Sequence, residues 1–460
     1  MTPQATPTIA LEKVEFLPAN HVTDDTSILT LKSLVLEPML RWQGGQIRVG
    51  LFAEWQLDDT GCCWTLRLPE GKCFHDGSLV TAQHAAEFIT RILGSRDMFG
   101  MPWSYARYLE GARIEPEGTV LRITTPKPFP DLPEILSEFY LPREDTQGRP
   151  VIGTGPWQVE SFTVGEETTL RRRSDNRRIR FVAQPQAEDR LAALTSGDIQ
   201  AATHLERLEI PQRALAGFTW QEQVGTLSVM AYMNGFEGIF RDPKARRAAN
   251  LAIDRIRLIA EVIGGLAIAA DTIVSPWHFG HPEAALTPLT YDPQEARRLL
   301  AECDGPRDVL LRAPTYMPER APEIARFMAE AWEAVGFNTK VDLAADRPKY
   351  AREIGQKQMG DAAIFDSSPH STFRVLDDKI SSQSRAVWWQ GVASPEVDTA
   401  FDTARHLINN TARASAYGSI LAQLQAAPPW AYLFRPILCL AHRPELEGFS
   451  LDQKGILRIA

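Results

Sequence analysis

Strand and helix signals alternate along the whole chain, and this alternation restricts the fold more than any other feature of the sequence. The stretch CCWTLRLPEGKCFHDGSLVTAQHAAEFITRIL, residues 62–93, shows the pattern. Trp64, Leu66 and Leu68 recur with the period of two that is typical of a strand, and Thr81 is placed to cap a helix. The sequence therefore predicts a mixed α/β protein, and 460 residues are enough for two or more lobes.

Four later stretches predict further elements of both kinds. Residues 118–137 predict a strand, a proline-rich break and a short helix. Residues 236–265 predict one long helical region that ends at two glycines. Residues 291–303 predict a helix capped by an aspartate, and residues 321–345 a helix, a glycine stop and a strand.

The charge of the chain argues against a nucleic-acid partner. The net charge is -9 and the isoelectric point about 5.6. The one basic run, LRRRSDNRRIR at residues 170–180, alternates with polar residues and predicts an exposed hairpin. Apolar runs such as EVIGGLAIAA are shorter than the roughly 20 residues that cross a bilayer. We therefore expect neither a nucleic-acid surface nor a transmembrane segment.

Cysteines and histidines predict no metal or other cofactor. The five cysteines are too few and too irregular for a disulfide scaffold, and no CxxC pair suggests zinc. His278 and His281 are close in sequence, but this spacing alone is a weak metal motif. The start, MTPQATPTIALEKVEF, shows no basic segment followed by an apolar one, so either a signal peptide has been removed or the protein is cytoplasmic.

Four landmarks in register carry a resemblance to a known family. They are the strand–turn–helix of residues 64–93, VIGTGPWQVESF at 151–162, RRAANLAIDR at 246–255 and YDPQEARRLLAECDG at 291–305. In these stretches the chain resembles the family 5 (cluster C) solute-binding proteins of ABC importers, which carry oligopeptides, nickel chelates and opines. With weaker flanking matches, the resemblance covers residues from Val35 to Tyr432.

The resemblance implies a two-lobe periplasmic-binding-protein fold of type II, with an extra small subdomain. Lobe I would be residues 1–233, including the subdomain at about 40–150. Lobe II would be residues 234–433, and the tail 434–460 would return to lobe I. We expect the chain to cross near Met233–Asn234 and near Tyr432–Arg435, with Asn234 available to a ligand. The family further implies a periplasmic monomer that is not an enzyme, and that passes a small polar solute to a membrane permease.

Three stretches of lobe I supply candidate ligand contacts. The segment GTGPW at residues 153–157 would use glycine to adopt positive φ and to face the ligand with the backbone N–H of Gly153 or Thr154, or it would only form a tight turn above a buried Trp157. Arg143, in a segment similar to that of nickel-type binders, would hold a carboxylate, or it would be an ordinary surface arginine. Trp103 would line the cleft or belong to the core.

The second lobe contributes the polar stretch at residues 364–391, IFDSSPHSTFRVLDDKISSQSRAVWWQG. Its polar residues follow a hydrophobic strand, where binding loops usually lie. The candidate contacts there are Asp366, Ser367, Ser368, His370, Arg385, Trp388 and Trp389. Alternatively the stretch is a solvated loop with Asp366 or Ser371 capping a helix. The two tryptophans are adjacent, so we expect at most one to face the ligand.

The ligand class stays open between several anionic or polyhydroxylated molecules. Serines replace the aromatic pair that nickel-type relatives carry in this region, and Gln383–Arg385 lies where they have a later histidine. A nickel or other metal chelate, an opine, a sugar phosphate and a short peptide are all candidates. Two alternatives rank lower: a cytoplasmic ligand sensor on the same fold, and a hydrolase using Ser368 and His370, for which no GxSxG turn is present.

Overall fold

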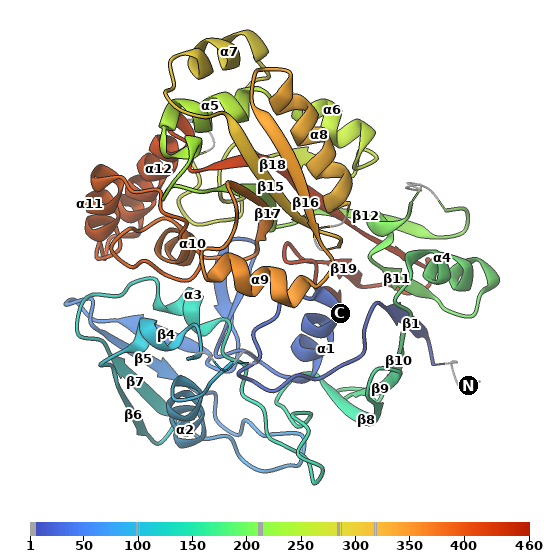
Figure 1. Cartoon of the computed structure of the whole chain (residues 1–460). Coiled ribbons are helices and arrows are strands. Elements are labelled where there is room, and N and C mark those ends of the chain that lie inside the picture. Colours follow the sequence, from blue (N-terminus) through green and yellow to red (C-terminus); the bar gives the residue numbers. More distant parts are fainter. Residues whose placement is uncertain are drawn as a thin grey trace. The chain divides into compact units, whose positions relative to one another are not determined.

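The chain forms two compact units. A computed structural model describes residues 6–97, 100, 102–209, 215–282, 286, 288–316, 318 and 320–460. Unit 1 comprises Met1–Gln223 and Leu438–Ala460, and unit 2 comprises Val224–Ile437 (Figure 1). The crossings predicted at Met233–Asn234 and Tyr432–Arg435 fall a few residues inside unit 2, and they remain our prediction for the hinges. Met98, Phe99 and Met101, in the stretch MFGMPWSYARYLEG (98–111) that contains the predicted site residue Trp103, lie outside the described residues.

The main sheet of unit 1 is mixed. Its strands, in spatial order, are β11 (Ala201–Thr203), β1 (Thr8–Leu11), β10 (Arg178–Ala183), β9 (Glu167–Arg172) and β8 (Trp157–Thr163). Strand β1 pairs in parallel with both β10 and β11, whereas β10–β9 and β9–β8 are antiparallel. Helix α1 (Thr26–Val35) packs on this sheet and helix α4 (Ala187–Ser196) precedes β11. Because Ile9, Leu170, Phe181 and Leu31 are fully buried, the core of the unit lies between the sheet and α1.

A second, smaller sheet holds the strand–turn–helix predicted from residues 62–93. It orders β4 (Glu54–Leu57), β5 (Cys63–Arg67), β7 (Val120–Thr124) and β6 (Arg113–Glu117), all antiparallel, with β2 (Leu40–Gln43) and β3 (Gln46–Val49) as a separate hairpin. Helix α2 (Ala82–Leu93) is capped by Thr81, whose hydroxyl accepts from the His84 N–H. Phe88 and Ile89 bury one face of α2. The predicted strand, turn and capped helix are confirmed, as is the short helix α3 (Leu132–Leu136) after the proline-rich break.

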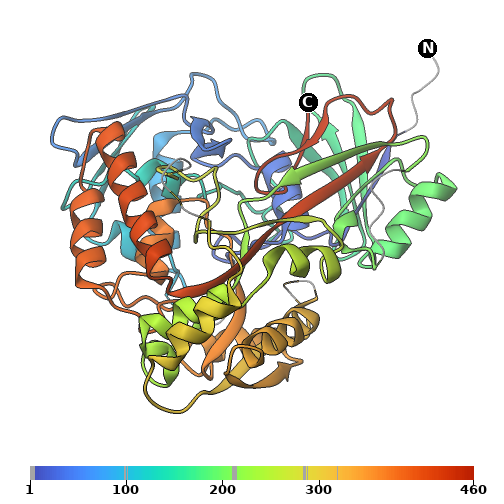
Figure 2. The ribbon, with the colours of Figure 1, turned by 90° about the horizontal axis from the view of Figure 1, so that it is seen from above.

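The strands of unit 2 also run in mixed directions. The spatial order is β16 (Asn338–Ala344), β15 (Asp308–Pro314), β17 (Ala362–Ser367), β13 (Ser228–Met233) and β18 (Trp430–His442), with β14 (Ala267–Ala269) also beside β18. Strand β15 is parallel to β16 and β17, and β13 is antiparallel to β17. Strand β18 is one long strand, drawn in red in Figure 2. All six residues of β17 are buried, so the sheet is covered on both faces there.

Helices of unit 2 follow the sequence predictions with one exception. Helices α7 (Pro293–Ala301, capped by Asp292) and α8 (Ala321–Glu333) are confirmed. The long helical region predicted at residues 236–265 is helical over most of its length, but it is not one continuous helix. It divides into α5 (Pro243–Leu251) and α6 (Arg255–Glu261), because the Asp254 side chain accepts the N–H of Arg257 and starts a second helix. The remaining helices are α9 (Arg347–Gly355), α10 (Thr372–Lys379), α11 (Pro395–Ala404) and α12 (Asn410–Ala426).

The basic run at residues 170–180 is the antiparallel turn between β9 and β10, as predicted. Arg178 pairs with Glu160 at 2.6 Å and Arg172 with Asp175 at 2.6 Å, both at least partly exposed. Half of the arginines of the run, Arg172, Arg178 and Arg180, thus pair with carboxylates of the same hairpin or of neighbouring strands. Among the described residues, no helix has both the length and the apolar character needed to cross a membrane.

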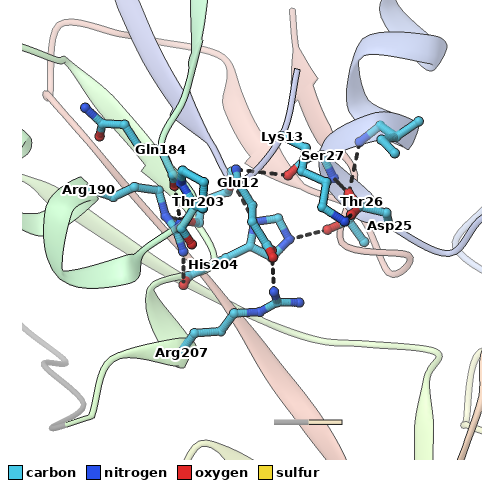
Figure 3. A network of polar contacts seen from close by, with 12 residues as sticks. Glu12, Lys13, Asp25, Thr26, Ser27, Gln184, Arg190, Thr203, His204 and Arg207 are labelled. Atoms are coloured by element: carbon cyan, nitrogen blue, oxygen red, sulfur yellow. Dashed lines mark hydrogen bonds and ion pairs between the residues drawn. The ribbon is translucent and has the colours of Figure 1, made fainter. Parts of the chain in front are cut away.

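A buried polar network ties α1, α4 and the end of β11 in unit 1 together (Figure 3). Arg190, with no exposed surface, donates from Nε to the Thr203 carbonyl at 2.9 Å and from Nη2 to the His204 carbonyl at 2.9 Å. The His204 ring contacts the hydroxyl groups of Thr26 and Thr203 through its two nitrogens. Burial and the nearby cations hold the pKa of His204 well below its ordinary value. The neutral imidazole is thus part of the unit's fold.

Candidate functional site

Arg143 lies on the surface of unit 1 with a fixed side chain. Its Nη1 donates to the Asp76 carboxylate at 2.9 Å and contacts the Ser78 hydroxyl, and its guanidinium carbon lies 5.2 Å from the centre of the Phe74 ring. The side chain is 43% exposed. The hydrogen bonds of this guanidinium within the described residues all start at Nη1, so the edge formed by Nε and Nη2 is available to an anion.

The GTGPW turn owes its glycines to close packing and not to positive φ. Neither Gly153 nor Gly155 lies in the left-handed region, which corrects our expectation. A Cβ on Gly153 would lie 2.1 Å from the Val35 carbonyl oxygen, and one on Gly155 would lie 2.4 Å from that of Leu34. Both glycines therefore let the turn lie directly against the C-terminal end of α1.

His75 occupies the polar edge of this turn and was not among the predicted site residues. Its Nδ1 accepts the N–H of Gly153 at 3.2 Å, and its Nε2 donates to the Gly155 carbonyl at 3.0 Å. Burial lowers the pKa of the ring, which favours this neutral form. A ligand contact through the Gly153 N–H would require the bond to His75 to break.

The turn Phe74–Ser78 links Arg143 to GTGPW. Phe74 and Asp76 contact Arg143, His75 contacts Gly153, and Arg143 exchanges backbone hydrogen bonds with Ile152, the residue before Gly153. The structure thus brings together two site segments that are separate in the sequence. A sequence signal for the site role of this turn was available, because Phe74–Gly77 lies in the strand–turn–helix that resembles the family.

Trp103 and Thr154 are buried polar side chains of unit 1. Trp103 is 2% exposed and its ring packs against Tyr105 and Phe139, each with centroids 4.9 Å apart. Thr154 is 3% exposed. Neither the Trp103 Nε1 nor the Thr154 hydroxyl has a hydrogen-bond partner among the described residues. Trp157 is fully buried below the turn, as the alternative of a core tryptophan predicts. A ligand role for Trp103 or Thr154 stays a prediction.

In unit 2 the predicted polar stretch begins on a buried strand end. Asp366 and Ser367 are the last residues of β17 and are 6% and 2% exposed, and His370 is 3% exposed. Ser368 is half-buried. Ser371 caps α10 by accepting the Arg374 N–H at 3.3 Å, which confirms the capping alternative for that residue.

An aromatic and cationic cluster surrounds this strand end. The Phe365 ring lies 5.4 Å from Tyr232 and 5.1 Å from Trp388, and the Arg347 guanidinium lies 4.7 Å above Phe365. Lys379, 5% exposed, donates to the Tyr232 hydroxyl at 2.8 Å and to the Asp366 carbonyl at 3.3 Å. Burial and the nearby acidic groups raise the pKa of Tyr232 well above its ordinary value. Arg347, Phe365 and Lys379 were not predicted, because α9, β17 and α10 bring them together from separate stretches.

The two adjacent tryptophans have different surroundings. Trp389 is 8% exposed, packs edge-on against Phe236 at 5.2 Å and donates from Nε1 to the Val392 carbonyl at 2.8 Å. Trp388 is half-buried against Phe365. Arg385 is exposed beside the Trp389 ring. Of the pair, Trp388 is therefore the one with surface left for a ligand.

The Asn234 side chain bonds to backbone groups of unit 2. Its side-chain oxygen accepts the N–H of Phe236 at 2.9 Å and its amide nitrogen donates to the Gly360 carbonyl at 3.0 Å. His278 is also a fold residue: it is buried, its Nε2 donates to the Pro369 carbonyl at 2.7 Å, and burial lowers its pKa to about 3. The part of the chain that the structure describes contains no cluster of three histidine, cysteine or acidic side chains arranged to hold a metal ion.

Comparison with known proteins decides the family. Residues 46–374 match the family model of bacterial extracellular solute-binding proteins, family 5, middle region. The chain belongs to this family. The nickel-binding periplasmic protein of Escherichia coli (strain K12) is 24% identical to this family 5 protein over 465 aligned positions, covering 90% of this chain and 86% of that one. The glutathione-binding protein GsiB of Shigella dysenteriae serotype 1 is 23% identical, covering 87% and 82%.

Solved structures show the same fold. NikZ from Campylobacter jejuni, crystallised in complex with Ni(L-His), superposes with a TM-score of 0.77 at 19% identity, covering 99% of this chain and 98% of that one. The predicted two-lobe fold of family 5 is confirmed. Family 5 proteins are solute-binding proteins of ABC importers and not enzymes, so the hydrolase alternative is set aside.

Proposed function

We propose that this protein captures a small anionic solute that carries at least one carboxylate or phosphate group, and passes it to the permease of an ABC importer. The ligand would be a metal chelate, an opine, a sugar phosphate or a short acidic peptide. The observation that carries the proposal is Arg143, an exposed guanidinium that is held in place and has a free donor edge.

The geometry of Arg143 suits an oxyanion better than a cation or a neutral sugar. Asp76 and Ser78 occupy Nη1 and Phe74 supports the flat face, so the side chain loses little conformational freedom when a ligand arrives. Nε and Nη2 are parallel donors that match the two oxygens of a carboxylate. An ammonium in the same place would offer one point charge without this match.

Unit 2 supports the same ligand class. Arg347 lies over the Phe365 ring, and Trp388 packs against the same ring. A cation beside aromatic rings favours an anionic ligand with a flat or apolar part. The relatives named above bind nickel or glutathione, and a nickel chelate and glutathione both carry carboxylates, so both belong in the first set of ligands to test.

Calorimetric titration with a defined panel tests the proposal. The panel contains nickel–histidine, nickel alone, glutathione, an opine, a sugar phosphate and a neutral tetrapeptide amide. We expect saturable one-to-one binding of at least one carboxylate or phosphate ligand and none of the neutral peptide. Native mass spectrometry of protein purified without added ligand would identify a copurified solute. Binding confined to the neutral peptide would contradict the proposal.

Ligand groups from both units would also make binding change the shape of the protein. We expect small-angle scattering to give a smaller radius of gyration at saturation, since a ligand stabilises the closed form by its differential affinity. The molecular mass from the same scattering data would test whether the protein is a monomer, as we propose. A periplasmic location is part of the proposal, and cell fractionation of the native host tests it.

A further inference from the structure

Lys357 has a backbone conformation that lysine rarely adopts. It follows α9 with φ of +68°, in the left-handed region. The N–H of Lys357 bonds to the Ile354 carbonyl and that of Gln358 to the Glu353 carbonyl, at 3.0 and 2.8 Å. This is the Schellman ending of a helix, in which the left-handed position is usually glycine. A lysine here is strained, so we expect its side chain to make contacts that offset the cost of this backbone conformation.

The Lys357 ammonium donates hydrogen bonds to three backbone carbonyl groups of one loop. Its Nζ donates to the carbonyl oxygens of Ala386 at 3.3 Å, Val387 at 2.6 Å and Trp389. An ammonium has three donors, and three carbonyls accept them. Desolvation lowers the pKa of Lys357 to about 8, and no acidic side chain contributes to this shift. The charge is thus stabilised by backbone dipoles rather than by a salt bridge.

Other contacts show that the whole loop rests on the end of α9. Gln390 donates from Nε2 to the Ile354 carbonyl at 3.2 Å, and a Cβ on Gly355 would already lie 2.9 Å from the Val387 side chain. On its other side the Gln390 carbonyl accepts the Gly235 N–H at 2.8 Å. The loop 385–390 is therefore held between α9 and the Asn234 turn, and Lys357 makes the charged contact.

We propose that Lys357 is a positioning residue of the ligand site, which fixes the backbone of residues 386–389 so that Trp388 is presented beside Phe365. The inference rests on the proposed function for its ligand, because Trp388 is the half-buried member of the tryptophan pair. It adds to that function a residue which lies behind the loop and acts through it. Without the ammonium, the Val387 and Trp389 carbonyls would lose this donor, and the Ala386 carbonyl would keep its bond from the Trp389 N–H.

The substitution Lys357→Gly separates this role from a general role in stability. Glycine adopts the left-handed conformation without strain, so the variant removes the ammonium while it relieves the backbone. We expect the melting temperature to change by no more than about 2 °C. Lys357→Met keeps the aliphatic stem and the strain, and Lys349→Met removes an exposed lysine of the same helix that lies 3.8 Å from Glu353.

Hydrogen exchange of the ligand-free protein is the deciding measurement. The reporters are the amides of Trp389, bonded to the Ala386 carbonyl, and of Gly235, bonded to the Gln390 carbonyl. We expect exchange of both to quicken at least about tenfold in Lys357→Gly and Lys357→Met, and not in Lys349→Met. Added n-butylammonium should restore protection in Lys357→Gly, and tetramethylammonium, which has no N–H donor, should not. Unchanged protection in Lys357→Gly would overturn the proposal.

Ligand titration then connects the loop to binding. With the ligand found in the calorimetric panel, we expect Lys357→Gly to weaken binding about tenfold and n-butylammonium to restore part of it. Faster loop exchange with unchanged affinity would overturn the positioning role while leaving the proposed function intact. Failure of the wild-type protein to bind any anion of the panel would count against the proposed function, and the exchange result would still decide whether Lys357 fixes the loop.

Discussion

The Nη1 of Arg143 lies 2.9 Å from the Asp76 carboxylate, in a pair whose side chains are 43% and 37% exposed. An ion pair this exposed contributes little to stability, typically about 0–1 kcal/mol. Its geometric effect is larger, because it holds the guanidinium over Phe74 through Nη1 and leaves Nε and Nη2 for other acceptors. The turn after β5, which belongs to one of the four family landmarks, therefore orients the arginine that we propose as a ligand contact.

Substitutions in the GTGPW turn test the close-packing account of its glycines. Gly153→Ala and Gly155→Ala would each place a methyl group within 2.4 Å or less of a carbonyl oxygen of α1. We expect each to destabilise the folded state by about 1–3 kcal/mol, measured by urea unfolding. Gly94→Ala is the matched control, because Gly94 has φ of -84° and its nearest contact to an added Cβ is 3.8 Å. Equal stability of Gly153→Ala and Gly94→Ala would contradict this account.

The pH dependence of stability should follow the buried histidines. Burial lowers the pKa of His278 from an ordinary 6.5 to about 3. Between these values the unfolded chain binds a proton that the folded chain does not, so stability is lost as the pH falls below 6.5. The slope for one such histidine approaches about 1.4 kcal/mol per pH unit. The His204 pKa is lowered in the same direction and adds to the loss.

Urea unfolding at about pH 7 and about pH 5.5 measures this loss. His278→Asn removes the titrating group, and we expect it to reduce the loss of stability between the two pH values, although the variant will be less stable at both. An undiminished pH dependence in His278→Asn would show that other groups dominate this range.

Tryptophan fluorescence separates the two neighbours of the second unit. Trp388 is half-buried against Phe365, whereas Trp389 is buried and its Nε1 is bonded to the Val392 carbonyl. We expect Trp388→Phe to lose most of the fluorescence change that ligand produces in unit 2, at little cost in stability. Trp389→Phe should keep that change and lower the melting temperature. Trp103→Phe reports on unit 1 in the same way, and an unaltered signal in Trp388→Phe would remove Trp388 from the site.

Features of the fold that depend on neighbouring residues could be predicted from the sequence. Thr81, Asp292 and Ser371 were expected to cap helices. The side chain of each accepts a backbone N–H two or three residues further along the chain. The break between α5 and α6 was missed because residues that favour helix lie on both sides of Asp254, and an aspartate can also stand inside a helix.

Site features that depend on distant residues could be predicted only in part. Arg143 was identified from its segment, but the contact with Asp76 joins residues 67 positions apart. Arg347 and Phe365 meet only because α9 and β17 are neighbours in the fold. The left-handed backbone of Lys357 has no sequence signal at all, since a lysine after a helix normally indicates only a favourable charge at its C-terminal end.

Calorimetric titration of Arg143→Ala beside wild type tests the central claim most directly. Arg149→Ala is the matched control, because Arg149 is also paired with an aspartate, Asp145 at 2.7 Å, and lies 5.5 Å from an aromatic ring, that of Phe162. Truncating one partner of a desolvated charge pair costs about 2–5 kcal/mol. We predict that Arg143→Ala weakens binding of the anionic ligand by about 30-fold or more, with the ligand-free melting temperature nearly unchanged, while Arg149→Ala binds as wild type does. Unchanged affinity in Arg143→Ala, or an equal loss in Arg149→Ala, would contradict the account.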